Sequence, residues 1–123
     1  MKAKELRIGN LFIDKYSKQI ISVLELLRSG NIVFDFECYG MWEAEPIPLN
    51  KEWLLKFGFQ FYIGWDEMEF WCLPKDKDNS DRFELYETLQ GFEAPSGKII
   101  KEVHTLQNCY FFHELSGEEL IIK

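Results

Sequence analysis

Three polar residues of the last predicted helix, Val103–Leu115, have side chains of the kinds that hold a small ligand. His104 and Asn108 share one stripe of that helix with Phe111, and Gln107 lies beside the stripe, at about 3.6 residues per turn. An imidazole and two amides supply donors and acceptors, which is one basis for binding a nucleotide. The alternative is that these groups bond to neighbouring loops and lock the helix in place.

Two other groups of residues resemble metal sites, but neither has the arrangement that a metal site requires. His104 and His113 lie nine positions apart on the same predicted helix, so their side chains point to opposite sides and cannot share an ion. Residues 76–87 place oxygen-bearing side chains at several calcium-loop positions, but Asp81 stands where that loop requires glycine. We therefore expect no metal and no cofactor.

A carboxylate cluster in the middle of the chain is the nearest approach to acid–base chemistry. Asp66, Glu67 and Glu69 can divide acid and base roles only if burial separates their pKa values. They follow Gly64-Trp65 in a predicted turn, where water solvates them. The chain contains no nucleophile-elbow, phosphate-loop or dinucleotide-binding motif. We expect no catalytic residue, and a protein that binds rather than catalyses.

Aromatic and acidic residues are the candidates for contact with a partner. Aromatic residues make up 16% of the chain, and rings beyond those that fill a core can form an interface. The candidate aromatic residues are Trp42, Trp65, Trp71, Tyr39 and Tyr62. The candidate acidic residues are Asp35, Glu37, Glu43 and Glu45, which we expect to form a stripe on the outer face of one hairpin.

The charge balance limits the classes of partner. The chain has a net charge of −7, from 14 basic and 21 acidic residues. Binding to nucleic acid requires a basic surface, so direct nucleic-acid and anionic-membrane contacts are disfavoured. An acidic surface can instead imitate DNA, and an inhibitor of a nucleic-acid-binding or defence protein is therefore an alternative function. Three widely spaced cysteines and no apolar run of signal-peptide or membrane-span length predict a protein of the cytoplasm.

The elements that must position these residues form a predicted α+β fold with a single domain, 1–123. A short middle helix, Lys51–Phe57, begins after Asn50 as N-cap and ends before Gly58. Period-2 alternation and turn residues predict an antiparallel β-meander or an SH3-like barrel around that helix and the longer C-terminal one. The predicted strands are Ile8–Asp14, Ile20–Leu27, Ile32–Cys38, Met41–Glu45, Phe59–Ile63, Met68–Cys72, Arg82–Thr88, Lys98–Lys101 and Glu118–Lys123. Open strand edges allow a homodimer.

Three stretches carry a family resemblance. They are LRIGN at 6–10, PIPLNKEWLLKFGF at 46–59, and VHTLQNCYF at 103–111 followed by GEEL at 117–120. The chain resembles an uncharacterised family of small proteins from phages, prophages and other mobile elements of Bacteroidetes-type bacteria. The resemblance covers about a third of the chain and none of residues 63–100. It implies an accessory role in the cytosol of a bacterial host and supplies no catalytic residue. We therefore expect an accessory protein that acts through protein contacts.

Overall fold

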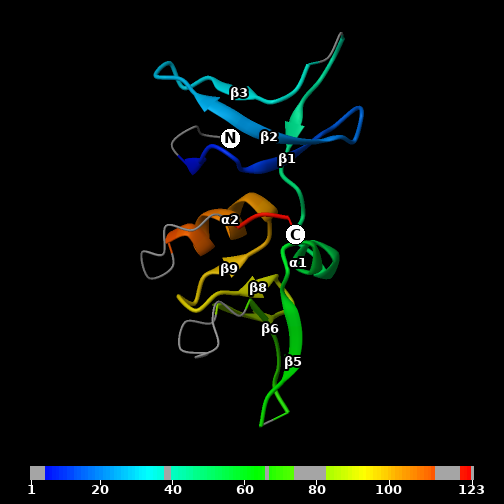
Figure 1. The fold of residues 1–123 in the computed structure, drawn as a ribbon, viewed down its shortest axis with the longest axis vertical. Coiled ribbons are helices and arrows are strands. Elements are labelled where there is room, and N and C mark those ends of the chain that lie inside the picture. Colours follow the sequence, from blue (N-terminus) through cyan, green and yellow to red (C-terminus); the bar gives the residue numbers. More distant parts are fainter. Residues whose placement is uncertain (1–4, 38–39, 66, 74–82, 113–119, 123) are drawn as a thin grey trace. The chain divides into compact units, whose positions relative to one another are not determined.

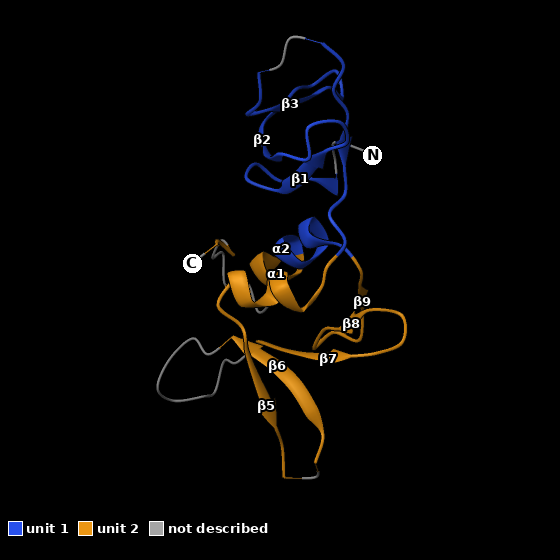
Figure 2. Ribbon diagram, turned by 90° about the vertical axis from the view of Figure 1, so that its right-hand side faces the viewer, with its two compact units in different colours: residues 1–48, 102–108 blue, residues 49–101, 109–123 orange. Residues whose placement is uncertain are grey.

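The chain is divided into two compact units that are each discontinuous in the sequence. A computed structural model describes residues 5–37, 40–65, 67–73, 83–112 and 120–122. Unit 1 consists of residues 1–48 and 102–108, and unit 2 consists of residues 49–101 and 109–123 (Figure 2). The C-terminal helix α2, Val103–Phe112, contributes residues to both units.

Unit 1 is built on a four-stranded antiparallel sheet. Its strands are β1 (Leu11–Asp14), β2 (Ile20–Leu26), β3 (Ile32–Phe34) and β4 (Ala44–Glu45), in the order β3-β2-β1-β4 (Figure 1). An irregularity in the β2–β3 register between Val23 and Glu25 is of the kind that bends a strand. The sheet curls around a core of Leu6, Phe12, Ile21 and Val23.

The predicted hairpin between the third and fourth strands is wrong. β4 pairs with β1 through Ile13↔Glu45 and Asp14↔Ala44, so β3 and β4 stand at opposite ends of the strand order. A contact between segments far apart in the sequence accompanies this pairing: the buried Asp14 carboxylate accepts the backbone N–H of Glu43 at 2.9 Å, which ties residues 43–45 to β1. β3 is also shorter than the predicted Ile32–Cys38, and Cys38 lies outside the described residues.

The middle helix of unit 2 forms as its sequence predicts. α1 spans Lys51–Lys56, and Asn50 Oδ1 accepts the Trp53 N–H at 3.0 Å. At the other end Gly58 has φ +92°, and the N–H groups of Gly58 and Phe59 donate to Leu55 and Leu54. This pair of bonds is a Schellman motif, which a left-handed glycine permits. The predicted apolar face is buried, since Trp53, Leu54 and Phe57 are all in the core.

Unit 2 contains a five-stranded antiparallel meander in sequence order. The strands are β5 (Gln60–Ile63), β6 (Glu69–Leu73), β7 (Phe83–Glu87), β8 (Phe92–Glu93) and β9 (Ile99–Ile100). One face packs in the core, where Phe83 contacts the rings of both Phe59 and Tyr110 of α2. β8 lies within residues 91–97, which the sequence predicts to be a loop. Strands of two residues leave no period-2 pattern to detect.

The predicted fold class is confirmed: the chain is α+β, and its described residues form antiparallel strands and two helices. The described part of α2 ends at Phe112, and residues 113–119 lie outside the described residues. Leu120–Ile122 belong to no strand, so that part of the predicted final strand is wrong. Most of the calcium-like segment, residues 76–82, is also outside the described residues, and its last part is β7.

Candidate functional site

The β5–β6 hairpin of unit 2 carries the exposed apolar side chains that best fit a contact surface. Both ribbon views show this hairpin extending beyond the rest of its unit (Figures 1 and 2). Phe61, Tyr62, Ile63 and Met68 are exposed along it, and Trp65 at its turn is fully exposed. Trp and Tyr contribute disproportionately to binding energy when a partner buries them.

One face of the hairpin continues the core of unit 2 into solvent. Alternate residues of a strand share a face, so Phe59, Phe61 and Ile63 point to the same side. Their exposed fractions rise from 1% at Phe59 to 46% at Phe61 and 65% at Ile63. The base of this face, at Phe59, is therefore in the core, and its outer half is exposed. The apolar pattern of a core strand thus becomes an exposed apolar surface.

The opposite face of the same hairpin carries a row of rings across three strands. Tyr62 stacks on Phe70 with ring centroids 5.7 Å apart, and Phe70 contacts Tyr86 at 5.8 Å. Such cross-strand aromatic pairs stabilise a sheet by roughly 0.2–1 kcal/mol each. The hydroxyls of Tyr62 and Tyr86 donate to Gln60 and Glu84 on the same face. This row stiffens the hairpin that presents the exposed residues.

β5 is an edge strand, and the ladder decides which of its backbone groups face outward. β5 pairs with β6 in the register Phe61↔Trp71, Tyr62↔Phe70 and Ile63↔Glu69. Gly64 continues this register by donating its N–H to Met68 at 2.8 Å, so the even-numbered residues bond toward β6. The N–H and C=O groups of Phe61 and Ile63 therefore point away from the sheet. Within the described residues no strand pairs with that edge.

Phe59 confirms this alternation from the other end of the strand. Its N–H also points away from β6, and it is taken by Leu54 O at 2.9 Å in the α1 cap. The edge thus has a defined open length, which begins after the helix cap and includes Phe61 and Ile63.

The turn of the hairpin is acidic and holds one residue in an unfavourable backbone conformation. Residues 60–73 include Asp66, Glu67 and Glu69 and no lysine or arginine. Asp66 lies outside the described residues, whereas Glu67 and Glu69 are exposed. Glu67 has φ +62°, a left-handed conformation that costs a side-chain-bearing residue about 1–2 kcal/mol. Three-residue hairpin loops ordinarily place glycine there.

The five predicted aromatic candidates have different environments. Trp65 and Tyr62 lie on this hairpin and are exposed. Trp42 is partly exposed, but its ring packs edge-on against Phe34 and Phe36 in unit 1. Trp71 is buried, so its assignment to the surface is wrong: its neighbours Phe61 and Leu85 cover it from both sides of the ladder. Tyr39 lies outside the described residues.

The predicted acidic stripe does not form on one hairpin. Asp35 and Glu37 follow β3, whereas Glu43 and Glu45 are at or beside β4, at the other end of the strand order. Glu43 also pairs with Lys15 at 3.6 Å, and Glu45 is half-buried. The four carboxylates therefore do not lie on one hairpin, and the DNA-mimic alternative rests on the net charge of −7.

The amides of the C-terminal helix are bonded to the N-terminal segment of the same unit. Gln107 is buried, accepts the N–H of Leu11 at 2.8 Å and donates to Gly9 O at 3.2 Å. Asn108 accepts from Asn10 Nδ2 at 2.8 Å and donates to Glu5 O at 3.0 Å. Each amide oxygen and nitrogen is thus engaged within the protein. These contacts are the helix-locking role that the sequence left open beside ligand binding.

His104 lies in the same unit, against the core. Its ring stacks on Phe12 with centroids 4.8 Å apart and an interplanar angle of 24°. Phe12 is fully buried, so His104 contributes to packing at the helix start. His113, with which it cannot share an ion, lies outside the described residues.

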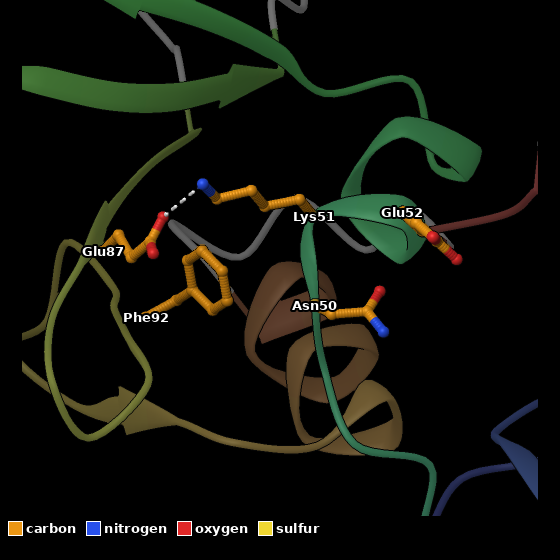
Figure 3. A pocket seen from close by; sticks show the side chains of 5 residues that line it. All are labelled: Asn50, Lys51, Glu52, Glu87 and Phe92. Carbon is orange, nitrogen blue, oxygen red and sulfur yellow. Dashed lines mark ion pairs between the residues drawn. The ribbon is translucent and has the colours of Figure 1, made fainter.

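A shallow pocket of about 430 Å³ opens beside α1 in unit 2 (Figure 3). Asn50, Lys51, Glu52, Glu87 and Phe92 line it. Lys51 Nζ pairs with Glu87 at 3.6 Å, and Asn50 Oδ1 caps the helix. Because Lys51 and Glu87 pair with each other and the Asn50 oxygen caps the helix, few of the lining polar groups are left to recognise a ligand.

The remaining reactive groups show no sign of activation in the described part of the chain. Burial raises the pKa of the Cys109 thiol, although nearby Lys98 opposes the shift, so the reactive thiolate is a minor form at neutral pH. No set of three or more His, Cys, Asp or Glu side chains among the described residues is arranged to hold a metal ion. None of the helices in those residues is both long and apolar enough to cross a bilayer.

Sequence reasoning missed Phe61 and Ile63 as surface residues. Their alternation with polar neighbours is the ordinary signature of a half-buried strand, and it carries no sign of where the cover ends. The available signal was position, since both lie just before a predicted turn. Comparison with protein-family models, curated proteins and solved structures found no match to this chain.

Proposed function

We propose that this chain is a non-enzymatic accessory protein that binds another protein through the β5–β6 hairpin. The carrying observation is the exposure of Phe61, Ile63 and Trp65 on one projecting hairpin. A solvent-facing tryptophan beside an uncovered continuation of the core face loses water only when a partner covers it. The resemblance of three sequence stretches to proteins of phages and mobile elements supports a role in the cytosol of a bacterial host.

The feature is suited to contact, because the three side chains that define it, Phe61, Ile63 and Trp65, are apolar rings and an aliphatic chain. Burying one such side chain contributes about 1.5–3 kcal/mol. Two of them lie on a strand that a cross-strand ring row stiffens and the third lies at its turn, and together they form an anchor of the kind found at the centre of protein interfaces. The hairpin loses little conformational freedom on binding for the same reason.

Comparative capture tests this function. The tagged full chain, the double variant Phe61→Ala with Trp65→Ala, and the control Leu89→Ala are each incubated with host lysate at physiological salt. Leu89 is a fully exposed leucine in the turn after β7, so its loss removes apolar surface without touching the hairpin. Recovered proteins are quantified by mass spectrometry.

We expect one protein to be recovered in stoichiometric amount with the unmodified chain and with Leu89→Ala, and at least tenfold less with the double variant. A tenfold loss corresponds to about 1.4 kcal/mol. Equal recovery with all three chains would exclude the hairpin as the binding surface. Repeating the capture at high salt separates the two functions: the hairpin contact should weaken only in part, because its apolar burial remains, whereas binding through an acidic surface alone weakens steeply.

A further inference from the structure

We infer that the hairpin binds its partner by strand addition: the open edge of β5 pairs with an extended, basic segment of that partner. This inference rests on the proposed function and specifies how the contact is made. Strand addition uses backbone hydrogen bonds for affinity and alternate side chains for specificity.

The backbone of β5 already has the spacing that an added strand requires. Phe61 and Ile63 each direct one N–H and one C=O to the open edge, two residues apart. A partner strand meets these four groups with its own alternate residues, because pairing groups recur every second residue in an antiparallel ladder. The α1 cap has taken the preceding outward N–H, that of Phe59, so the added strand has a defined end.

The side chains beside this edge define two surfaces for the added strand. Phe61 and Ile63 are exposed on one face, and the exposed Tyr62 is on the other. An added strand would lie about 4.8 Å from β5, the ordinary spacing between strands, and would place its own alternate side chains beside these three residues. Apolar or β-branched residues at those positions bury the side chains that are exposed there.

Charge identifies the partner as basic and argues against a second copy of this chain. Glu69 lies directly opposite Ile63 and is exposed, and Glu67 is exposed at the turn. No lysine or arginine occurs in residues 60–73, and the whole chain carries −7. A lysine or arginine of the added strand can lay its long stem along Ile63 and reach toward Glu69. Two copies would instead bring two acidic hairpins together.

Substitution at Ile63 separates backbone pairing from side-chain contact. Ile63→Pro removes an N–H that points outward, so it breaks no bond between β5 and β6, and proline is tolerated at such edge positions. Ile63→Ala removes the same side chain and keeps the N–H. The two variants therefore differ in the backbone donor, and we expect them to unfold at similar urea concentrations.

The probe is a short synthetic peptide in which lysine alternates with valine, titrated into the full-length chain by calorimetry. Controls are the same peptide with glutamate in place of lysine, and the lysine peptide with alternate backbone nitrogens methylated. We expect saturable binding of the lysine peptide alone, weakened by salt, and about tenfold weaker for Ile63→Pro than for Ile63→Ala. Binding of the glutamate peptide with equal affinity, or of no peptide at all, overturns the inference.

Amide hydrogen exchange on the unmodified chain gives a readout that needs no variant. In the free protein the Tyr62 and Gly64 amides, which point toward β6, exchange slowly, and those of Phe61 and Ile63 exchange fast. With the lysine peptide bound, the Phe61 and Ile63 amides become protected. Peptide binding that leaves them unprotected overturns strand addition.

Two further outcomes distinguish this inference from the proposed function. If Ile63→Pro and Ile63→Ala capture the cellular partner equally, while Phe61→Ala with Trp65→Ala does not, the hairpin binds through side chains and only the strand addition fails. If the hairpin double variant also captures the partner normally, the proposed function fails. A concentration-dependent dimer that Ile63→Pro abolishes would show that a second copy occupies the edge, contrary to the charge argument.

Discussion

Phe61 and Trp71 face each other across the β5–β6 ladder with ring centroids 5.3 Å apart, yet their exposures differ about ninefold. Trp71 is 5% exposed and Phe61 is 46% exposed. Trp71 lies on β6, between β5 and β7, where Phe61 and Leu85 flank it, whereas Phe61 lies on β5, which pairs with one strand only among the described residues. The core of unit 2 therefore ends within a single cross-strand pair, and the proposed binding surface starts there.

Because Trp71 is buried and Trp65 is exposed, we expect their substitutions to change the free energy of unfolding by very different amounts. Trp71→Ala opens a cavity in the core and is expected to lower the free energy of unfolding by about 3–5 kcal/mol. Trp65→Ala removes a fully exposed side chain and is expected to change it by no more than about 0.5 kcal/mol. Urea denaturation of both variants measures the difference. A large loss for Trp65→Ala would mean that its ring packs within the protein and does not await a partner.

The left-handed Glu67 predicts a stabilising substitution in the turn. Glu67→Gly relieves the φ +62° conformation and is expected to raise the free energy of unfolding by up to about 1 kcal/mol. The same change removes one acidic group and is expected to weaken binding of the lysine peptide. Glu67→Asn, which tolerates the left-handed region but lacks the charge, separates the two effects. If neither variant resists urea better than the unmodified chain, the left-handed conformation of Glu67 does not destabilise the turn.

The hydrogen bonds of the Asp14 carboxylate predict that the stability of unit 1 falls at acidic pH. The Ser17 hydroxyl, and then the backbone N–H groups of Glu43 and Ser17, donate to this carboxylate and lower its pKa, although burial opposes the shift. A pKa lowered in the folded state contributes stability above the unfolded value of roughly 3.9, and that stability is lost as pH falls from there through the folded pKa.

Asp14→Asn tests this dependence. We expect a lower melting temperature at neutral pH, because an amide has only one acceptor oxygen for the donors that the carboxylate serves. We also expect less further loss than in the unmodified chain between about pH 4 and pH 2. Thermal unfolding followed by circular dichroism across that range measures both. Parallel curves for the two chains would mean that the carboxylate does not carry the acid sensitivity.

Gln107 predicts a cost for breaking the contact between α2 and the N-terminal segment. Gln107→Ala leaves the Leu11 N–H without its acceptor and is expected to lower the free energy of unfolding by about 1–3 kcal/mol. The Leu11 amide should then exchange faster with solvent. Gln19→Ala is the matched control, since Gln19 is an exposed glutamine of the same unit, and should cost no more than about 0.5 kcal/mol. Equal losses in the free energy of unfolding for the two variants would mean that the Gln107 hydrogen bonds do not stabilise this contact.

The α1 helix illustrates which elements the sequence predicts well. Asn50 as N-cap, the apolar positions Trp53, Leu54 and Phe57, and Gly58 at the end form a complete local code, because each acts on neighbours within one turn. The strands β2, β5, β6 and β7 begin and end within one residue of their predicted bounds, since alternation and turn residues are also local. β1 begins at Leu11, three residues after its predicted start. No such local pattern predicts the short strand β8 or the strand with which β4 pairs.

The sequence by itself determined the α+β class, the two helices and the period-2 faces of the longer strands, because capping, glycine conformation and alternation act between neighbouring residues. Only the tertiary structure decided that β4 pairs with β1, that Trp71 is buried while Phe61 is exposed, and that Gln107 bonds to Leu11. Those outcomes depend on which distant segments meet. Which strands pair, and which side chains become buried, depends on the whole chain, so the spacing of neighbouring residues does not predict them.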